Sequence, residues 1–136
     1  MSDIIKHECG IVLIRLLKPL DYYRKKYGSA RYALNKLHLL MEKQHNRGQD
    51  GAGIACIKFD VEPGERYIGR FRSNAPQALR EIVEKVNSYF EEIRINEPSK
   101  LNDTDYLKDQ VPFIGELLMG HLRYGTFGKN SIESCH

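Results

Sequence analysis

An amphipathic pattern in residues 76–93 constrains the fold more than any other feature of the sequence. Its apolar side chains recur every three or four residues, which is the spacing of a single helix face. They are Leu79, Ile82, Val83, Val86, Phe90 and Ile93. Pro76 is expected to open this helix, because proline is tolerated in a first turn. Such a helix must bury its apolar face against another element, so the chain needs a second apolar layer.

Four short apolar runs can supply that layer. Residues 9–17, 51–59 and 116–123 are predicted as strands, because each is brief and apolar and is followed or interrupted by glycine or proline. Residues 65–71 are predicted as the hairpin partner of the second strand, since Pro63 and Gly64 form a turn signal between the two.

A second helical pattern begins after Ser29, a residue type favoured as N-cap, and is predicted to end near Gln44. Residues 21–28 are aromatic and basic and give no decisive signal, and the polar residues 96–111 are interpreted as a loop or surface insertion. The order strand, helix, strands, helix, strand is typical of an α+β layered domain.

Composition excludes several classes of protein. The chain has 136 residues, enough for one domain, and its formal net charge of +3 is too small to indicate nucleic-acid binding. No apolar run is long enough to cross a membrane, and residues 1–8 lack the apolar centre of a secretory signal. The three cysteines are widely spaced and odd in number, which favours a reducing compartment. We therefore expect a cytoplasmic protein without nucleic-acid or membrane partners.

Cys9 opens the first predicted strand and is a candidate nucleophile. The thiolate is the reactive form, and a free thiol has a pKa of about 8.5, so a base must take its proton. His7 lies two residues earlier. After a cleavage between Glu8 and Cys9, the new α-amine, with a pKa of about 7.7–8.0, could also serve as that base. The alternative is a small buried core residue.

Two glycine-rich segments carry arginines that could hold a carboxylate. Residues 47–53 read R-G-Q-D-G-A-G, and glycine lets a backbone approach a ligand closely. Residues 120–126 read G-H-L-R-Y-G-T, where the Arg123 fork could bind a carboxylate that the Thr126 hydroxyl shares. The alternatives are a helix cap with a turn for the first segment, and a structural ion pair for Arg123.

Together with C-G-I-V at residues 9–12, these segments resemble the class II glutamine amidotransferases. The sequence R-G-Q-D, preceded by Gln44 and His45, is most similar to the members that deliver ammonia to phosphoribosyl pyrophosphate in purine biosynthesis. The resemblance implies the N-terminal-nucleophile fold, a four-layer αββα sandwich, here incomplete. It also implies that residues 1–8 are a leader or propeptide-like segment and that residues 9–136 are the N-terminal part of a glutaminase domain.

The resemblance assigns roles to individual residues. Cys9 matches the nucleophile that attacks the side-chain amide of glutamine, releases ammonia and leaves a thioester that water hydrolyses to glutamate. Arg123 and Thr126 match the residues that hold the glutamine α-carboxylate, and Tyr124 matches a position that lines the glutamine pocket. The loop packed beside the nucleophile is matched by Arg47 and Gly48.

The resemblance also implies what this chain lacks. The family's oxyanion-hole Asn-Gly pair would lie beyond His136, so we expect a fragment with little or no glutaminase activity. We expect no cofactor or metal in this chain, because Mg²⁺ with phosphoribosyl pyrophosphate belongs to a missing phosphoribosyltransferase domain. The expected partners are glutamine, that domain and further copies of the chain in a homo-oligomer.

Two other interpretations stay open. The chain could be a truncated paralogue or regulatory protein that keeps the fold without the activity. It could also belong to another class II amidotransferase, such as one that makes glucosamine phosphate or asparagine, although R-G-Q-D argues against this. Outside the candidate site, Cys56 is predicted to be core and His38 a packed or surface residue. Cys135 and His136 have no matching ligand pair that would predict a metal site.

Overall fold

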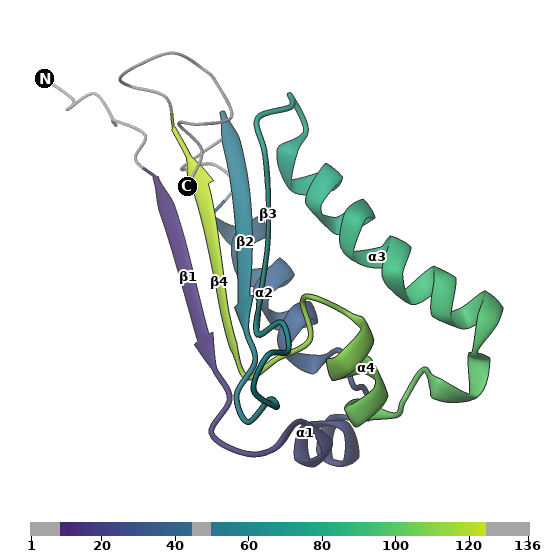
Figure 1. Cartoon of the computed structure of the whole chain (residues 1–136). Helices are drawn as coiled ribbons and strands as arrows, with labels where there is room; N and C mark the ends of the chain where they lie inside the picture. Colours follow the sequence, from purple (N-terminus) through teal and green to yellow (C-terminus); the bar gives the residue numbers. More distant parts are fainter. Residues whose placement is uncertain (1–8, 45–49, 125–136) are drawn as a thin grey trace, which may run out of the picture.

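The computed structural model describes residues 9–44 and 50–124, which form an antiparallel sheet with helices (Figure 1). The four strands of the sheet are β1 (Gly10–Arg15), β2 (Gly51–Ile57), β3 (Ile68–Ser73) and β4 (Leu117–Arg123). Their order across the sheet is β1-β4-β2-β3, so the last strand lies between the first two. All neighbouring strands are antiparallel.

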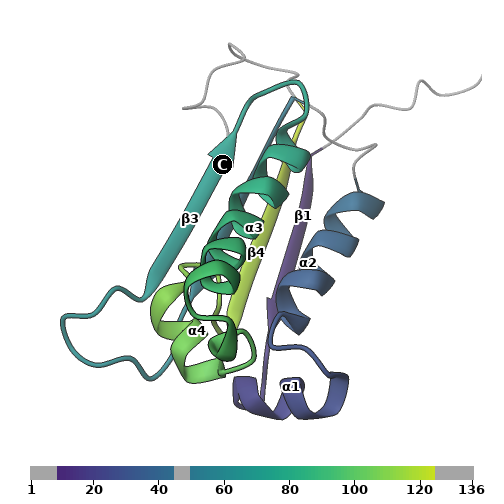
Figure 2. The same cartoon turned by 90° about the vertical axis from the view of Figure 1, so that its right-hand side faces the viewer.

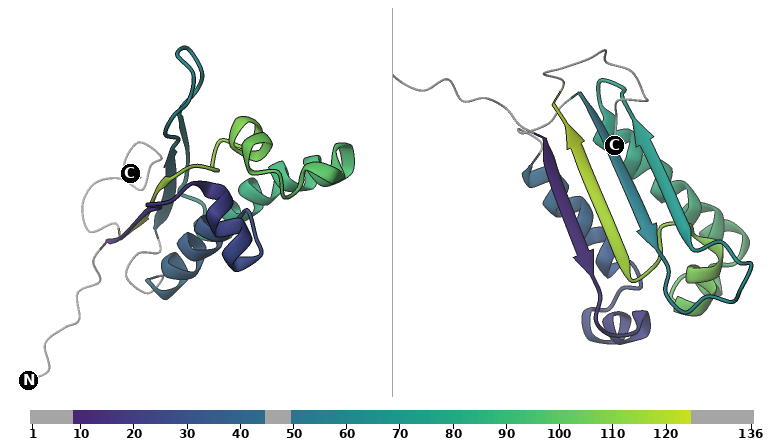
Figure 3. Two further views of the ribbon diagram at one scale, coloured as in Figure 1. Left: turned by 90° about the horizontal axis from the view of Figure 1, so that it is seen from below. Right: turned by 60° about the vertical axis from the view of Figure 1, so that its left-hand side comes forward.

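The helices lie on one side of this sheet (Figure 2). The two long helices, α2 (Tyr32–Lys43) and α3 (Ala78–Asn96), run along the strands. The shorter helices α1 (Leu20–Tyr27) and α4 (Thr104–Gln110) lie near the end of the sheet where β1 ends and β4 begins (Figures 1 and 2). The other side of the sheet carries no helix of the described chain (Figure 3).

Alternation along the strands sends successive side chains to opposite faces of the sheet. On the helix side, Val12 of β1 pairs with Gly120 of β4, which pairs with Ile54 of β2, and all three are buried. One residue further along, Ile11 pairs with His121, and Ile11 is exposed. We call the first surface the covered face and the second the open face.

The two long helices confirm the helical patterns of the sequence. The predicted apolar positions Ile82, Val86, Phe90 and Ile93 are buried in α3. The predicted N-cap of α2 is wrong: the helix begins at Tyr32, after Arg31, and has no side-chain cap. Ser29 instead accepts a hydrogen bond from the Arg31 amide at 3.0 Å, a local turn that precedes the helix.

Residues 96–111 are not the loop that their polarity indicates. After a short 3₁₀ turn, Pro98–Lys100, the segment forms α4, with the Asp103 carboxylate accepting from the Tyr106 amide at 3.0 Å as N-cap. Leu107 and Val111 are fully buried against the rest of the core. Burial of these two apolar side chains, one helical turn apart, therefore holds the segment against the core as a helix, although most of its residues are polar.

An ion pair ties α4 to the sheet. Lys108 Nζ lies 2.6 Å from Glu116 Oε1, and the other carboxylate oxygen accepts from the Phe59 amide at 2.8 Å. Lys108 also donates to the Phe59 carbonyl, and Lys58 donates to the carbonyl of Lys108. Because the buried Glu116 carboxylate is bonded at both oxygens, the usual cost of burying a charge is offset.

The α+β prediction is confirmed, as an antiparallel sheet of four strands with four α-helices in the described part of the chain. Three predicted strands lie where expected. The hairpin partner begins at Ile68, three residues later than the predicted residue 65. Within residues 9–44 and 50–124, no helix is both long enough and apolar enough to cross a bilayer.

Candidate functional site

Three strand ends meet at one end of the sheet, the upper end in Figure 1. β1 starts there, β4 ends there and β2 starts there, because Gly10 pairs with Leu122 and Gly51 pairs with Arg123. The structure therefore places the first and last predicted site segments side by side, although they lie at opposite ends of the described chain.

Cys9 directly precedes β1 and is exposed. Its sulfur accepts a hydrogen bond from the Tyr124 amide at 3.4 Å and contacts the Tyr124 carbonyl oxygen at 3.9 Å. Gly10 and Leu122 belong to the covered face, so the next residue outward on each strand, Cys9 and Arg123, belongs to the open face. Thiol and guanidinium thus start from adjacent strands on the same side of the sheet.

A glycine behind Cys9 allows α2 to pack close to the strand. A Cβ atom at Gly10 would lie 2.5 Å from Oε1 of Gln44, the residue that ends α2. The Gln44 side-chain amide also donates to the carbonyl of Ile11 at 3.2 Å. The missing side chain at Gly10 therefore lets the end of α2 pack closely against the start of β1, next to Cys9.

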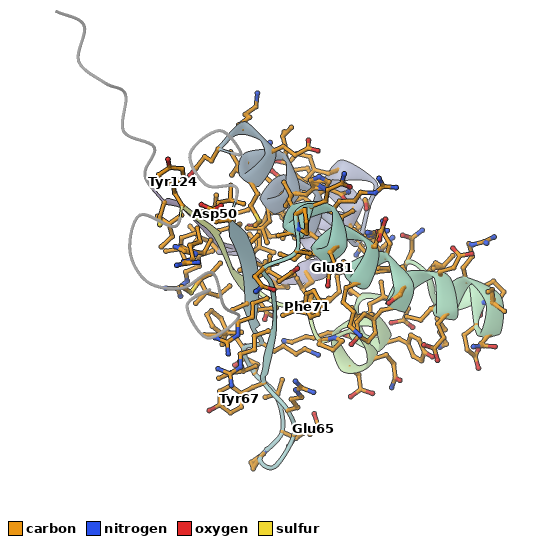
Figure 4. The ribbon with its side chains drawn as sticks, turned by 90° about the horizontal axis from the view of Figure 1, so that it is seen from above. Asp50, Glu65, Tyr67, Phe71, Glu81 and Tyr124 are labelled. Carbon is orange, nitrogen blue, oxygen red and sulfur yellow. The ribbon has the colours of Figure 1, made fainter. Side chains whose placement is uncertain are left out.

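Arg123 is buried, with 5% of its surface exposed. A buried guanidinium needs compensating partners, and its fixed fork suits a planar carboxylate. The Asp50 amide donates to the Arg123 carbonyl at 2.9 Å, and the Asp50 and Tyr124 side chains lie at the same end of the sheet (Figure 4). Asp50 is not among the predicted site residues, although it closes R-G-Q-D immediately before β2.

The remaining predicted site residues lie outside the described residues. These are Arg47, Gly48 and Thr126, together with the leader at residues 1–8 and the pair Cys135 and His136. The structure thus brings Cys9, Arg123 and Tyr124 together, and the roles of all six candidates stay predictions.

The second described cysteine has the opposite environment. Cys56 lies on the covered face with 1% of its surface exposed, which confirms its prediction as a core residue. Burial raises the pKa of the Cys56 thiol to about 12, so the thiol stays protonated at neutral pH. A thiol held in that form is a poor nucleophile, which leaves Cys9 as the reactive candidate among the described cysteines.

Other polar groups are accounted for structurally. His38 is partly buried in α2, with Nε2 at 2.9 Å from the Glu42 carboxylate, in agreement with its interpretation as a packed or surface residue. Across residues 9–44 and 50–124, no three His, Cys, Asp or Glu side chains gather closely enough to hold a metal ion.

Comparisons with protein-family models, with curated proteins and with solved structures gave no match to this chain.

Proposed function

We propose that this chain carries the cysteine nucleophile and the carboxylate-binding arginine of a class II glutamine amidotransferase. One observation carries the proposal. Cys9 and Arg123 lie at the neighbouring ends of β1 and β4, on the same face of the sheet. Cys9 is exposed, whereas Arg123 is buried. Glutamine needs such a pair, because its reacting amide and its α-carboxylate lie at opposite ends of one small molecule.

The chemistry follows from these two groups. Arg123 would bind the α-carboxylate with two parallel hydrogen bonds and hold the side-chain amide toward Cys9. The Cys9 thiolate adds to the amide carbon, the carbon–nitrogen bond breaks, and nitrogen leaves as ammonia after taking a proton. Water then attacks the thioester, which yields glutamate and returns the thiol.

The open face supports the finer fold assignment, an N-terminal-nucleophile sandwich. Ile11 and Leu13 of β1 expose about two thirds of their surfaces, at 65% and 64%, and Met119 of β4 exposes 39%. Large contiguous apolar patches mark interaction surfaces. A second sheet packed on this face would complete the αββα layers, with the candidate site at the border between the two sheets.

R-G-Q-D favours phosphoribosyl pyrophosphate as the acceptor of the ammonia, which makes the proposed whole protein an amidophosphoribosyltransferase of purine biosynthesis. Its phosphoribosyltransferase domain would bind Mg²⁺ with that acceptor, and this chain would contribute the glutaminase part to a cytoplasmic homo-oligomer.

A glutamine analogue with a diazoketone in place of the amide tests the proposal, because covalent labelling needs binding and attack but no turnover. We expect labelling at Cys9, detected by peptide mass mapping, and protection by glutamine. Arg123→Met should slow this labelling at least about tenfold, since a hydrogen bond to a charged group contributes about 1.5–3 kcal/mol. Arg70→Met, an exposed arginine on β3, is the matched control and should change nothing.

Iodoacetamide is the control reagent, because it alkylates a thiol without recognising glutamine. Arg123→Met should leave alkylation of Cys9 by iodoacetamide within about twofold of the parent rate, since the exposed thiol itself is unchanged. Labelling by the diazoketone that glutamine does not slow, or that Arg123→Met leaves unchanged, contradicts the proposal.

One observation favours a non-catalytic relative that keeps the fold. Among the described residues, the hydrogen-bond contacts of the Cys9 sulfur are with the Tyr124 backbone, which supplies no general base. A folded chain whose Cys9 reacts with iodoacetamide but not with the glutamine analogue would support that alternative.

A further inference from the structure

A groove runs between α2 and α3, away from the candidate site. The two helices are antiparallel, since the start of α2 lies beside the middle of α3 and the end of α2 lies beside its start (Figure 2). The groove encloses a cavity of about 300 Å³. Its floor is apolar and comes from both helices and from β2 of the sheet. The floor residues are Leu37, Met41, Ile54, Ile82 and Val86.

One end of this groove holds the cation of Arg31, which has no carboxylate partner among the described residues. The Arg31 guanidinium lies 3.9 Å above the Phe90 ring, and its Nη2 donates to the Asn87 side-chain oxygen at 2.6 Å. Nε of Arg31 is buried and has no hydrogen-bond partner among the described residues. Burial lowers the pKa of Arg31, although a guanidinium stays protonated at neutral pH.

The other end of the groove has carboxylates beside its basic side chains. His38 of α2 faces Glu42 at 2.9 Å, and Arg80 of α3 faces Glu84 at 3.0 Å. Between the two ends, the walls are formed by half-buried apolar side chains such as Leu79 and Val83. The groove is therefore asymmetric, with positive charge at the Arg31 end and an apolar channel leading away from it.

We propose that this groove binds a small amphiphilic carboxylate, with its head at Arg31 and its apolar tail along the floor between α2 and α3. Binding sites for small molecules are mostly apolar cavities of about 300–1,000 Å³ with a few polar groups that fix orientation, which describes this groove. The helix rise of about 1.5 Å per residue gives about 16 Å between residues 31 and 42, enough for an extended acyl chain.

Calorimetric titration of the whole chain with decanoate and with decan-1-ol tests the proposal. Decanoate should bind saturably with one molecule per chain, and decan-1-ol should bind at least about tenfold more weakly, because it lacks the charge that Arg31 recognises. Arg31→Gln should weaken decanoate at least about tenfold and leave decan-1-ol unchanged. Arg94→Gln, at an exposed position of α3, should bind decanoate like the parent.

Two further variants test whether the groove itself is the binding site. Val83→Trp fills the groove with Arg31 intact and should abolish decanoate binding while the far-ultraviolet circular dichroism stays that of the parent. Leu13→Asp disrupts the open face and should leave decanoate binding unchanged. Equal affinity for decanoate and decan-1-ol, an unaffected Arg31→Gln variant, or loss of binding in Leu13→Asp would each overturn the proposal.

Discussion

The two faces of the sheet share every strand and have opposite environments. Leu118 and Met119 are adjacent on β4, yet Leu118 on the covered face is 1% exposed and Met119 on the open face is 39% exposed. The covered face packs against the helices of its own chain. The open face holds Cys9 and Arg123 at one end and exposed apolar side chains along its length.

The open face also differs in charge. The strand residues on the open face include Arg15, Arg70 and Arg72. No strand residue on this face is acidic. The covered face is almost wholly apolar, apart from Ser73. The difference indicates that the covered face supplies most of the buried apolar packing of the described chain, whereas the open face leaves apolar and basic side chains exposed.

The largest expected effect compares the two neighbours on β4. Leu118→Ala should lower the free energy of unfolding by about 2–5 kcal/mol, because it removes buried methyl groups and leaves a cavity. Met119→Ala should cost no more than about 0.5–1 kcal/mol, since its side chain is partly in water already. Urea unfolding followed by circular dichroism measures both. A similar loss in Met119→Ala would mean that the open face is packed in solution.

The next effect uses two neighbours on β3. A Cβ atom at Gly69 would lie 2.3 Å from the carbonyl oxygen of Pro112, and a backbone atom cannot move aside cheaply. Gly69→Ala should therefore destabilise the chain by about 1–3 kcal/mol. Arg70→Ala, on the open face, should stay within about 0.5 kcal/mol of the parent. Thermal unfolding at one protein concentration compares them, and equal stabilities would contradict this packing.

The reactivity of the two described thiols allows the open and covered faces to be compared without any substitution. Iodoacetamide should alkylate Cys9 at least about 100-fold faster than Cys56 in the folded chain, because Cys56 is both buried and protonated. Raising the pH from about 7 to 9 should not bring Cys56 into reaction, since its pKa of about 12 stays well above that range. Mass mapping of each cysteine peptide follows the reaction, with urea-unfolded chain as the control. Rapid alkylation of native Cys56 would show that the covered face opens.

The smallest effect concerns a contact at the far end of the open face. The Arg15 guanidinium lies 5.5 Å from the centre of the Phe59 ring. Arg15→Ala should cost only about 0.5–1 kcal/mol, as expected for an exposed cation–π contact. Arg15→Lys should recover part of that loss in urea unfolding. A loss as large as that of Leu118→Ala would erase the distinction between the faces.

The sequence predicted the elements whose periodicity is long and regular. α3 has six apolar positions on one face, and the strands have short apolar runs bounded by glycine or proline. α4 was missed because it has only seven residues, and its anchors are tertiary: the buried Leu107 and the ion pair between Lys108 and Glu116. No local pattern encodes those contacts.

Local sequence patterns also could not predict the order of the strands in the sheet. β4 lies between β1 and β2, which requires pairing between residues far apart in the chain. For the candidate site, the motifs predicted Cys9 and Arg123, and the pairing of β1 with β4 shows that they share a face. Asp50 was missed, because its link to Arg123 is a backbone hydrogen bond that residue types do not reveal.

The position of β4 has a consequence for how the chain acquires its shape during synthesis. Of the described strands, β1 is made first, and its hydrogen-bonding partner β4 is made last. The nascent strand that begins beside Cys9 must therefore wait until β4 has been made before it can form this pairing. This pairing brings the thiol and the guanidinium together, so a nascent chain that has not reached β4 cannot do so.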